Sequence, residues 1–339
     1  MEPLVANKNV EVVEVKRVFL VMVLLTLLVV VGLAAKYTFY FISHIGPSDP
    51  NMKWLTVAIE DIEKILPVEV RYFAPKTFSI KAQVDLLKTA IAANPDGLIV
   101  PITDPNALDE PLREAIAKGI PVIAANIPDP RPEDERIPYL TYVGGDEYLT
   151  GVFMGKELLK TFGDKKPKRV AVGLAHVGHV GAEMRAQGMI DVLKPLGIPV
   201  DKIALTDDPA KIMQTWQAYL TAHPDTEAIW LVTLLATPYV VQVNEQMGRG
   251  DVKVFTVDES PLAIEGIRAG KVVATHSQQF YLQGWLPTMW LYIYNEYGYT
   301  PPPQILTGPV IINRENADEW REKVIKVFGE DLYNQLGSW

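Results

Sequence analysis

The chain has 339 residues, a length typical of two domains of roughly 150 residues each. Its composition, 48% hydrophobic and 22% charged, excludes a disordered chain, and its net charge of −9 without any Lys/Arg run argues against a nucleic-acid partner. Cysteine is absent, which excludes disulfides, thiolate metal sites and a lipid-modified N-terminal cysteine.

The first segment carries a membrane-insertion signal. Lys16 and Arg17 precede an uncharged apolar run over residues 18–35, which ends in small residues suited to cleavage. We predict an N-terminal hydrophobic helix over residues 1–35, acting as a signal peptide or as a membrane anchor. A predicted strand begins at Tyr37 with no linker before it, and this favours cleavage near Ala35. In both cases the protein body lies outside the cytoplasm, in the periplasm or at the cell surface.

Short apolar runs and amphipathic segments alternate beyond residue 36. The runs predict strands buried on both faces, at 37–42, 68–73, 97–100, 121–125, 139–143, 169–175, 228–232, 252–257 and 272–277. The segments between them predict helices, such as 80–93, 108–117, 148–161, 182–193, 211–222 and 261–269. Alternating strands and helices predict doubly wound parallel sheets.

A weak internal repeat predicts two lobes of like topology. The segment 93–96 (Ala-Asn-Pro-Asp) matches 222–225 (Ala-His-Pro-Asp), and the pairs Lys36/Lys168 and Asn126/Asp258 occupy similar offsets. Ligands of open parallel sheets bind beyond the carboxyl ends of the strands, so two facing lobes place two such edges across one cleft. The residues that follow the predicted strands are therefore candidates for a binding site: Ser43, His44, Thr103, Asp104, Asn126, residues 176–181, Thr233, Asp258 and Gln278.

At these positions the chain resembles the class I periplasmic binding proteins, in their ribose-binding-like sugar branch, from about residue 37 to about residue 316. The stretches that carry the resemblance are 43–50 (SHIGPSDP), 94–100 (NPDGLIV), 119–123 (GIPVI), 142–146 (YVGGD), 183–188 (EMRAQG), 255–258 (FTVD), 278–284 (QQFYLQG) and 306–309 (LTGP).

The resemblance implies a three-strand hinge, with crossovers near 144–146, 278–279 and 306–308. The N-terminal lobe would comprise 37–144 plus 279–306, and the C-terminal lobe 145–278 plus 307–339. It further implies a sugar or polyol ligand trapped by hinge closure, docking to the membrane permease of an ABC transporter, no cofactor and no catalysis. We expect a monomer.

Asp258 is the strongest ligand-binding candidate, because a carboxylate accepts hydrogen bonds from adjacent sugar hydroxyls. The alternative is a helix cap before Ser260. Asn126 lies where relatives often place an aspartate, and its alternative is a turn residue. Gln278 is either a ligand contact or a plain interlobe hydrogen bond.

Other candidates are less specific. Glu183 and Thr233 depart from the family pattern, which has an arginine and an asparagine there, and so imply a ligand other than ribose; Arg185 is expected to pair within the second lobe. Trp54 and Phe280 are candidates for stacking on a sugar ring, with core packing the alternative for Trp54. The remaining candidates on loops at the cleft are Ser43, His44, Asp49, Asp104 and His179.

His44, His176 and His179 could bind a metal, but they are poorly spaced for a fixed chelate. Three other functions compete with sugar transport. A cytoplasmic transcription regulator with the same two-lobed ligand domain would need a helix-turn-helix ahead of residue 37, where the membrane-insertion segment stands instead. An enzyme lacks support because no nucleophile elbow, phosphate loop or dinucleotide fingerprint is present. A membrane-tethered receptor for a sugar-like signal remains an alternative if the N-terminal segment is retained.

Overall fold

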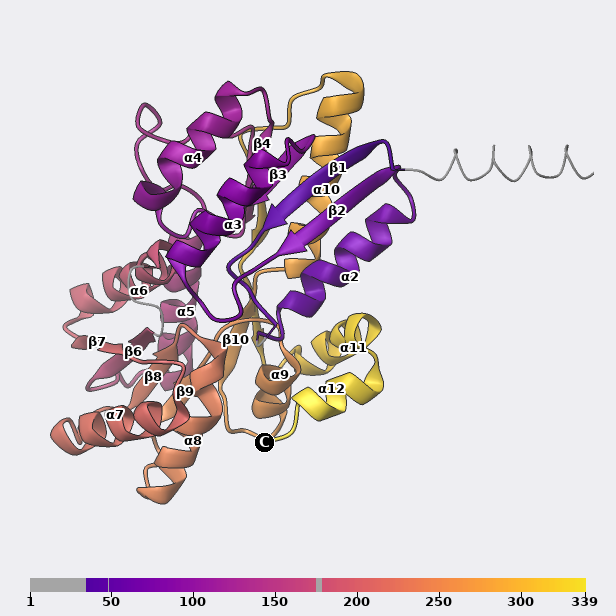
Figure 1. The fold of residues 1–339 in the computed structure, drawn as a ribbon. Helices are drawn as coiled ribbons and strands as arrows, with labels where there is room; N and C mark the ends of the chain where they lie inside the picture. Colours follow the sequence, from indigo (N-terminus) through magenta and orange to yellow (C-terminus); the bar gives the residue numbers. More distant parts are fainter. Residues whose placement is uncertain (1–34, 48, 175–178) are drawn as a thin grey trace, which may run out of the picture.

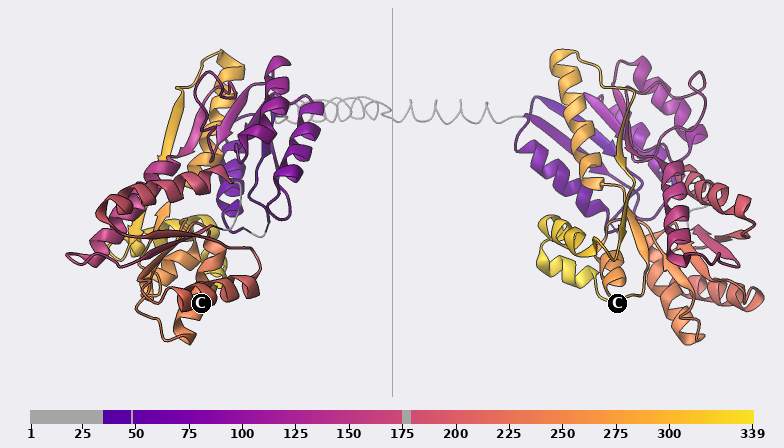
Figure 2. Two further views of the ribbon diagram at one scale, coloured as in Figure 1. Left: turned by 90° about the vertical axis from the view of Figure 1, so that its left-hand side faces the viewer. Right: turned by 180° about the vertical axis from the view of Figure 1, so that it is seen from behind.

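Two six-stranded sheets form the framework of the molecule. The computed structural model describes residues 35–47, 49–174 and 179–339, so the predicted N-terminal hydrophobic helix lies outside the described residues. The first sheet has the strand order β11-β5-β4-β3-β1-β2 and the second β12-β10-β9-β8-β6-β7. When the strands of each sheet are counted along the chain, the two sheets have the same order, as the weak sequence repeat predicted. Each sheet forms the centre of one α/β lobe (Figures 1 and 2).

The strands of the first sheet are β1 (Tyr37–Ile42), β2 (Val68–Phe73), β3 (Gly97–Val100), β4 (Val122–Ala125), β5 (Tyr142–Gly145) and β11 (Gln304–Gly308). Those of the second are β6 (Val170–Leu174), β7 (Val200–Ala204), β8 (Ala228–Leu231), β9 (Lys253–Phe255), β10 (Ala274–Ser277) and β12 (Val310–Asn313). All pairs are parallel except β10 with β12, which is antiparallel. The second sheet is therefore mixed at its edge, whereas the sequence predicted parallel sheets.

Helices cover both faces of each sheet. They are α2 (Met52–Glu63), α3 (Ile80–Ala92), α4 (Pro105–Ala117), α5 (Glu147–Phe162), α6 (Val180–Leu193), α7 (Pro209–Ala222), α8 (Thr237–Gln246), α9 (Pro261–Arg268), α10 (Phe280–Tyr297), α11 (Ala317–Phe328) and α12 (Glu330–Leu336). In Figure 1, α2 and α10 lie together on one face of the first sheet, while α3 and α4 cover the other. Among the described residues, none of the helices combines the length and the apolarity needed to cross a lipid bilayer.

Three strands at sheet edges escaped the sequence prediction, namely β7, β11 and β12. Each of them alternates exposed and half-buried residues and has a single buried one, so no continuous apolar run marks them in the sequence. The predicted strand at 139–143 is also displaced, since β5 runs from Tyr142 to Gly145. Its two terminal glycines, which carry no apolar side chain, are nevertheless buried and paired with β11.

The chain passes between the two sheets three times. The first passage leads from β5 into α5, the second from β10 into α10, and the third follows the turn at Gly308-Pro309 between β11 and β12. The core also continues between the lobes, because Trp54 of α2 packs against Phe328 of α11 with ring centroids 5.1 Å apart. Both lobes are thus assembled from segments that lie far apart in the sequence.

Helices α5 and α6 cross at glycine contacts. A Cβ atom at Gly151 would lie 1.9 Å from the carbonyl oxygen of Arg185, and one at Gly188 would lie 2.1 Å from that of Tyr148. Backbone atoms at these distances leave no room for a side chain. This close crossing sets the position of α6, which carries a residue of the site described below.

We expect Gly151→Ala to lower the free energy of unfolding by about 1–3 kcal/mol, because the added methyl group forces the two helices apart. Chemical denaturation measures this change. Gly155→Ala is the matched control on the same helix, since its Cβ would meet the Val192 side chain at 3.1 Å and no backbone atom closer than the Met189 Cα at 3.6 Å. Equal stabilities for the two variants would contradict the assigned role of the crossing.

Candidate functional site

A cavity of about 80 Å³ lies where the carboxyl ends of the two sheets face each other. This is room for several water molecules. Both lobes contribute to its lining, through His44, Ile45, Asp49, Asn51, Asn126, Ile127, His179, Ala182, Arg185, Val232, Thr233, Leu234, Leu235, Val257, Asp258, Gln278 and Phe280. A second cavity of about 350 Å³ adjoins it and shares His44, Asp49 and Leu235. The site therefore occupies the crevice that doubly wound sheets leave at their carboxyl edges.

In each lobe, a residue with a positive φ angle brings a polar side chain to the cavity. Asn126 follows β4 with φ of 67°, and Asp258 follows the strand segment of β9 with φ of 69°. Asn and Asp are the side chains best tolerated in this left-handed region. The hydroxyl of Tyr142 lies 2.6 Å from the carbonyl oxygens of Asn126 and Gly145 and holds the first of these turns in place.

Hydrogen bonds join the polar side chains of the two lobes into one network. The Asn51 Nδ2 donates to Asp258 Oδ2 at 2.7 Å, and the Gln278 Nε2 donates to the other carboxylate oxygen at 2.6 Å. The Asn126 Nδ2 in turn donates to the Oε1 atoms of Gln278, at 3.1 Å, and Gln283, at 2.9 Å. All five side chains are buried. Hydrogen bonds from both lobes therefore fix the orientation of the Asp258 carboxylate.

Glu259 anchors the second passage between the sheets. Its carboxylate accepts from the backbone N–H groups of Gln278, at 3.0 Å, and Phe280, at 2.9 Å. The Thr307 hydroxyl donates to the Gln278 carbonyl at 2.7 Å and links this passage to the third one. Burial, with the neighbouring charge of Asp258 adding to it, raises the pKa of Glu259 to about 7.

A buried ion pair supports the cavity from the second lobe. The Arg185 guanidinium donates its Nε–H to Glu147 at the start of α5 and its Nη2–H to Gln278 Oε1 at 2.9 Å. Arg185 is thus paired within its own lobe, in line with the sequence interpretation. It also lines the cavity, which the sequence interpretation did not include.

Asp49 is the second carboxylate of the cavity. Its Oδ1 accepts from the Asn51 backbone N–H at 2.8 Å. Burial chiefly, and then the charge of Asp258, raises the pKa of Asp49 to about 7, with Asp207 adding a smaller contribution. Proximity of two carboxylates in a closed space thus favours a proton on one of them.

We expect closure of the two lobes over this cavity to depend on pH. The contacts that bury Asp49 raise its pKa, so the closed form binds a proton more tightly than an open form in which Asp49 is solvated. Protonation of Asp49 therefore favours closure below about pH 7. This contribution to closure is lost as the pH rises through that value. We expect the radius of gyration of the ligand-free protein, measured by small-angle X-ray scattering, to be larger at pH 8 than at pH 6. Asp49→Asn should lack most of this change, and an equal change in that variant would contradict the assignment.

Eight of the twelve predicted site residues line the cavity, namely His44, Asp49, Asn126, His179, Thr233, Asp258, Gln278 and Phe280. The imidazole rings of His44 and His179 come from different lobes and lie 5.2 Å apart. His179 also caps α6, because its Nδ1 accepts from the Ala182 N–H at 3.2 Å. His176 lies outside the described residues. No metal-binding group of three or more His, Cys, Asp or Glu side chains occurs in the part of the chain that the structure describes.

The structure places the other four predicted residues outside the cavity lining. Ser43 is buried and its hydroxyl oxygen accepts from the Ile45 N–H. Trp54 packs in the core against Phe328, as its alternative interpretation had it. Glu183 is exposed and pairs with Lys202 at 2.8 Å on the outer side of α6. A local hydrogen bond accounts for Ser43, an ion pair for Glu183 and core packing for the ring of Trp54, whose Nε1 is buried without a partner among the described residues.

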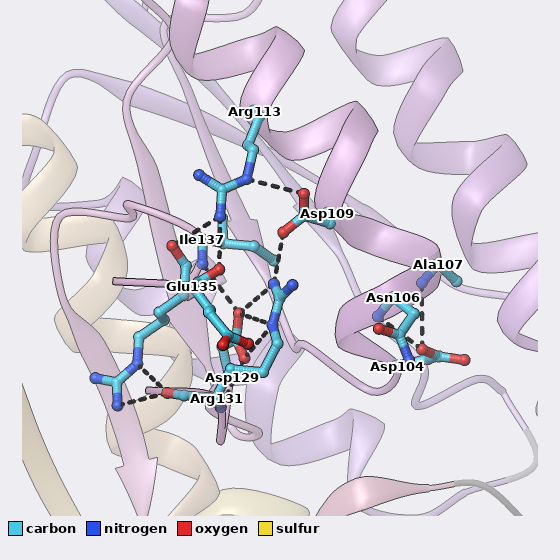
Figure 3. A network of polar contacts seen from close by, with 10 residues as sticks. Asp104, Asn106, Ala107, Asp109, Arg113, Asp129, Arg131, Glu135 and Ile137 are labelled. Carbon is cyan, nitrogen blue, oxygen red and sulfur yellow. Dashed lines mark hydrogen bonds and ion pairs between the residues drawn. The ribbon is translucent and has the colours of Figure 1, made fainter. Parts of the chain in front are cut away.

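Asp104 is the fourth of these residues. Its carboxylate accepts from the backbone N–H groups of Asn106 and Ala107 and so caps α4, as Figure 3 shows. The same figure shows the neighbouring loop held by Arg131, which bridges Asp129 and Asp109. These ion pairs organise the loop after β4 and hold it beside the site.

Sequence reasoning missed four polar residues of the site: Asn51, Glu147, Arg185 as a lining residue, and Gln283. Asn51 precedes α2 and follows Asp49-Pro50, and this turn within the family-like stretch was the available signal. Gln283 lies one turn into α10, inside another such stretch. Glu147 directly follows the first passage between the sheets.

The chain is similar in sequence to known sugar-binding proteins. A xylose/arabinose-binding protein of Sulfolobus acidocaldarius is 28% identical over 268 residues, which are 75% of this chain and 65% of that protein. A ribose import binding protein of Escherichia coli is 25% identical over 53% of this chain and 59% of its own length. The chain therefore spans less than two thirds of the length of these curated relatives.

Solved structures show the same fold. A periplasmic sugar-binding protein of an ABC sugar transporter from Legionella pneumophila superposes with a TM-score of 0.75 at 28% identity, covering 80% of this chain and all of that one. A carbohydrate transporter protein of Acidothermus cellulolyticus, solved with myo-inositol, has a TM-score of 0.78 at 23% identity over 86% of this chain and 99% of its own. The model of the periplasmic binding protein domain matches residues 39–296. The chain belongs to the periplasmic binding protein family.

Proposed function

We propose that this protein is the extracytoplasmic sugar-binding subunit of an ABC importer. The observation that carries the proposal is the network of Asn51, Asp258, Gln278 and Asn126, which converges on one cavity from two facing sheet edges. Amides and carboxylates with both donor and acceptor atoms suit a ligand whose hydroxyl groups do both. The relatives, which are named as binding proteins for xylose, arabinose and ribose, support the same function.

The ligand is a monosaccharide or a sugar-like polyol that is held and released without chemical change. In this proposal the lobes are 37–144 plus 279–306 and 145–278 plus 307–339, and they close over the ligand about the three passages of the chain. The permease of the importer then docks to the closed form. Residues 1–35 direct export and are cleaved, which mass measurement of the mature N-terminus tests.

The decisive experiment is to denature freshly purified protein and identify any released small molecule by mass. Titration calorimetry with xylose, arabinose, ribose, glucose, galactose and myo-inositol then measures affinity. We expect a released sugar or polyol, or micromolar or tighter binding of at least one compound. Release of no carbohydrate together with no binding across such a panel, extended to amino sugars, would contradict the proposal. Turnover of a bound sugar would instead indicate an enzyme.

A further inference from the structure

The end of the cavity around Asn51 is rich in hydrogen-bond acceptors. Asn51 is 2% exposed, and its Nδ2 is used on Asp258. Its Oδ1 is buried without a hydrogen-bond partner among the described residues. The carboxylates of Asp49 and Asp258 line the same cavity, and they accept from the backbone N–H and from the Nδ2 of Asn51 respectively. Burying an amide oxygen without a hydrogen-bond partner costs free energy, so a ligand group that donates to this oxygen would stabilise the complex.

The donors of the surrounding network are directed mainly at acceptors of the network itself, and one hydrogen each of the Asn51 and Gln278 amides remains. The Nε2 of Gln278 donates to Asp258, and the Nδ2 of Asn126 donates to Gln278 and Gln283. Arg185 donates to Glu147 and to Gln278. A sugar hydroxyl placed beside Asn51 would donate one hydrogen, but its own lone pairs would find few donors there.

The formal charge at the cavity is negative. The half-buried carboxylate of Asp49 and the buried carboxylate of Asp258 line the cavity together with one guanidinium, that of Arg185. Two further buried carboxylates adjoin these groups, since Glu147 pairs with Arg185 and Glu259 is the neighbour of Asp258. The other ionisable lining groups are the imidazoles of His44 and His179, and the adjoining cavity adds Lys76 and Asp207, one charge of each sign. Burial penalises such an excess of like charge unless a proton or a cationic ligand group neutralises part of it.

We propose that the ligand carries a protonated amino group, as an amino sugar or an amino cyclitol does, and that this group lies between Asp49, Asp258 and the Oδ1 of Asn51. The inference rests on the proposed function and specifies its substrate class. An ammonium group has three donors and no acceptor, which matches three converging acceptors without leaving a lone pair unsatisfied. The hydroxyl groups of the same ligand face the part of the cavity lined by Gln278, Asn126 and Arg185.

Titration calorimetry at pH 7 with matched compounds tests this inference. The probes are D-glucose and D-galactose, their 2-amino, 3-amino and 6-amino deoxy derivatives, their N-acetyl forms, and myo-inositol with an aminodeoxyinositol. We expect at least one amine to bind tenfold or more tightly than its neutral parent. Its N-acetyl form, which retains the nitrogen without the charge, should bind more weakly than the amine.

Two variants locate the amino group. Asp49→Asn and Asp258→Asn keep the shape of the side chain, and each should reduce the preference for the amine to less than threefold. Glu183→Gln removes a carboxylate outside the cavity and should leave the preference unchanged. Neutral parents that bind as tightly as every amine, or a preference that survives both variants, would overturn the inference and leave the proposed function standing. Failure of all compounds, neutral and amino alike, would contradict the proposed function itself.

Discussion

Replacing Asp258 with alanine is expected to weaken sugar binding by at least about 100-fold. The carboxylate accepts from Asn51 and Gln278, and a hydrogen bond to a charged group contributes about 1.5–3 kcal/mol. Its loss leaves two buried amide donors unsatisfied as well as removing the acceptor offered to the ligand. Because about 1.4 kcal/mol corresponds to tenfold in affinity, the combined loss exceeds two orders of magnitude. Titration calorimetry, and the mass of any co-purified molecule, measure the effect.

The conformation at this position calls for a second variant. Alanine is strained at φ of 69°, whereas asparagine is tolerated there, as Asn126 shows at the equivalent place in the other lobe. Asp258→Asn should therefore fold well and still bind more weakly. Asp104→Ala is the matched control, because that aspartate also follows a strand but caps α4 outside the cavity. Retention of affinity in both Asp258 variants would refute the site.

Removal of the buried partner of Arg185 should produce the largest loss of stability. Glu147 is 1% exposed and Arg185 is 6% exposed, so Glu147→Ala leaves a guanidinium charge in the interior. Breaking a buried pair in this way typically costs about 3–5 kcal/mol, and we expect a decrease of that size in the free energy of unfolding. Urea denaturation monitored by tryptophan fluorescence measures it.

An exposed ion pair between α6 and β7 provides the comparison. Glu183 and Lys202 are each about half exposed, and Glu183→Ala should cost less than about 1 kcal/mol. The double variant Glu147→Leu/Arg185→Met should recover part of the lost stability, since it removes both buried charges. Recovery remains partial because Arg185 also offsets the charge of Asp258. A loss below about 1 kcal/mol in Glu147→Ala would show that the pair is dispensable.

The rule that ligands bind at the carboxyl ends of parallel strands predicted much of the site from the sequence. Asn126, Asp258 and Gln278 each end or follow a recognisable apolar run, and the structure brings them together through two hydrogen bonds. The central strands were equally readable, because burial on both faces makes their sequences continuously apolar. Local sequence patterns therefore predicted those strands that are buried on both faces.

Long-range packing and the orientation of helices could not be predicted from the sequence in the same way. Trp54 meets Phe328 across more than two hundred and fifty residues of sequence, so no local pattern distinguishes core packing from a ligand contact. Glu183 and Arg185 lie two residues apart on α6, which places them on opposite sides of the helix. The sequence prediction selected the side that faces solvent. The edge strands were missed because all but one of the residues in each strand are exposed or half-buried.

The late position of α10 in the chain affects how the protein is synthesised. Five of the six strands of the first sheet, β1 to β5, have been made once Gly145 has emerged, but α10, which covers one of their faces, begins only at Phe280. At about 5–20 residues per second, the ribosome needs roughly 7 to 27 seconds to make the intervening segment. During that interval the nascent first lobe presents uncovered hydrophobic surface. Its susceptibility to aggregation during translation is therefore set by chain order and is independent of the stability of the finished molecule.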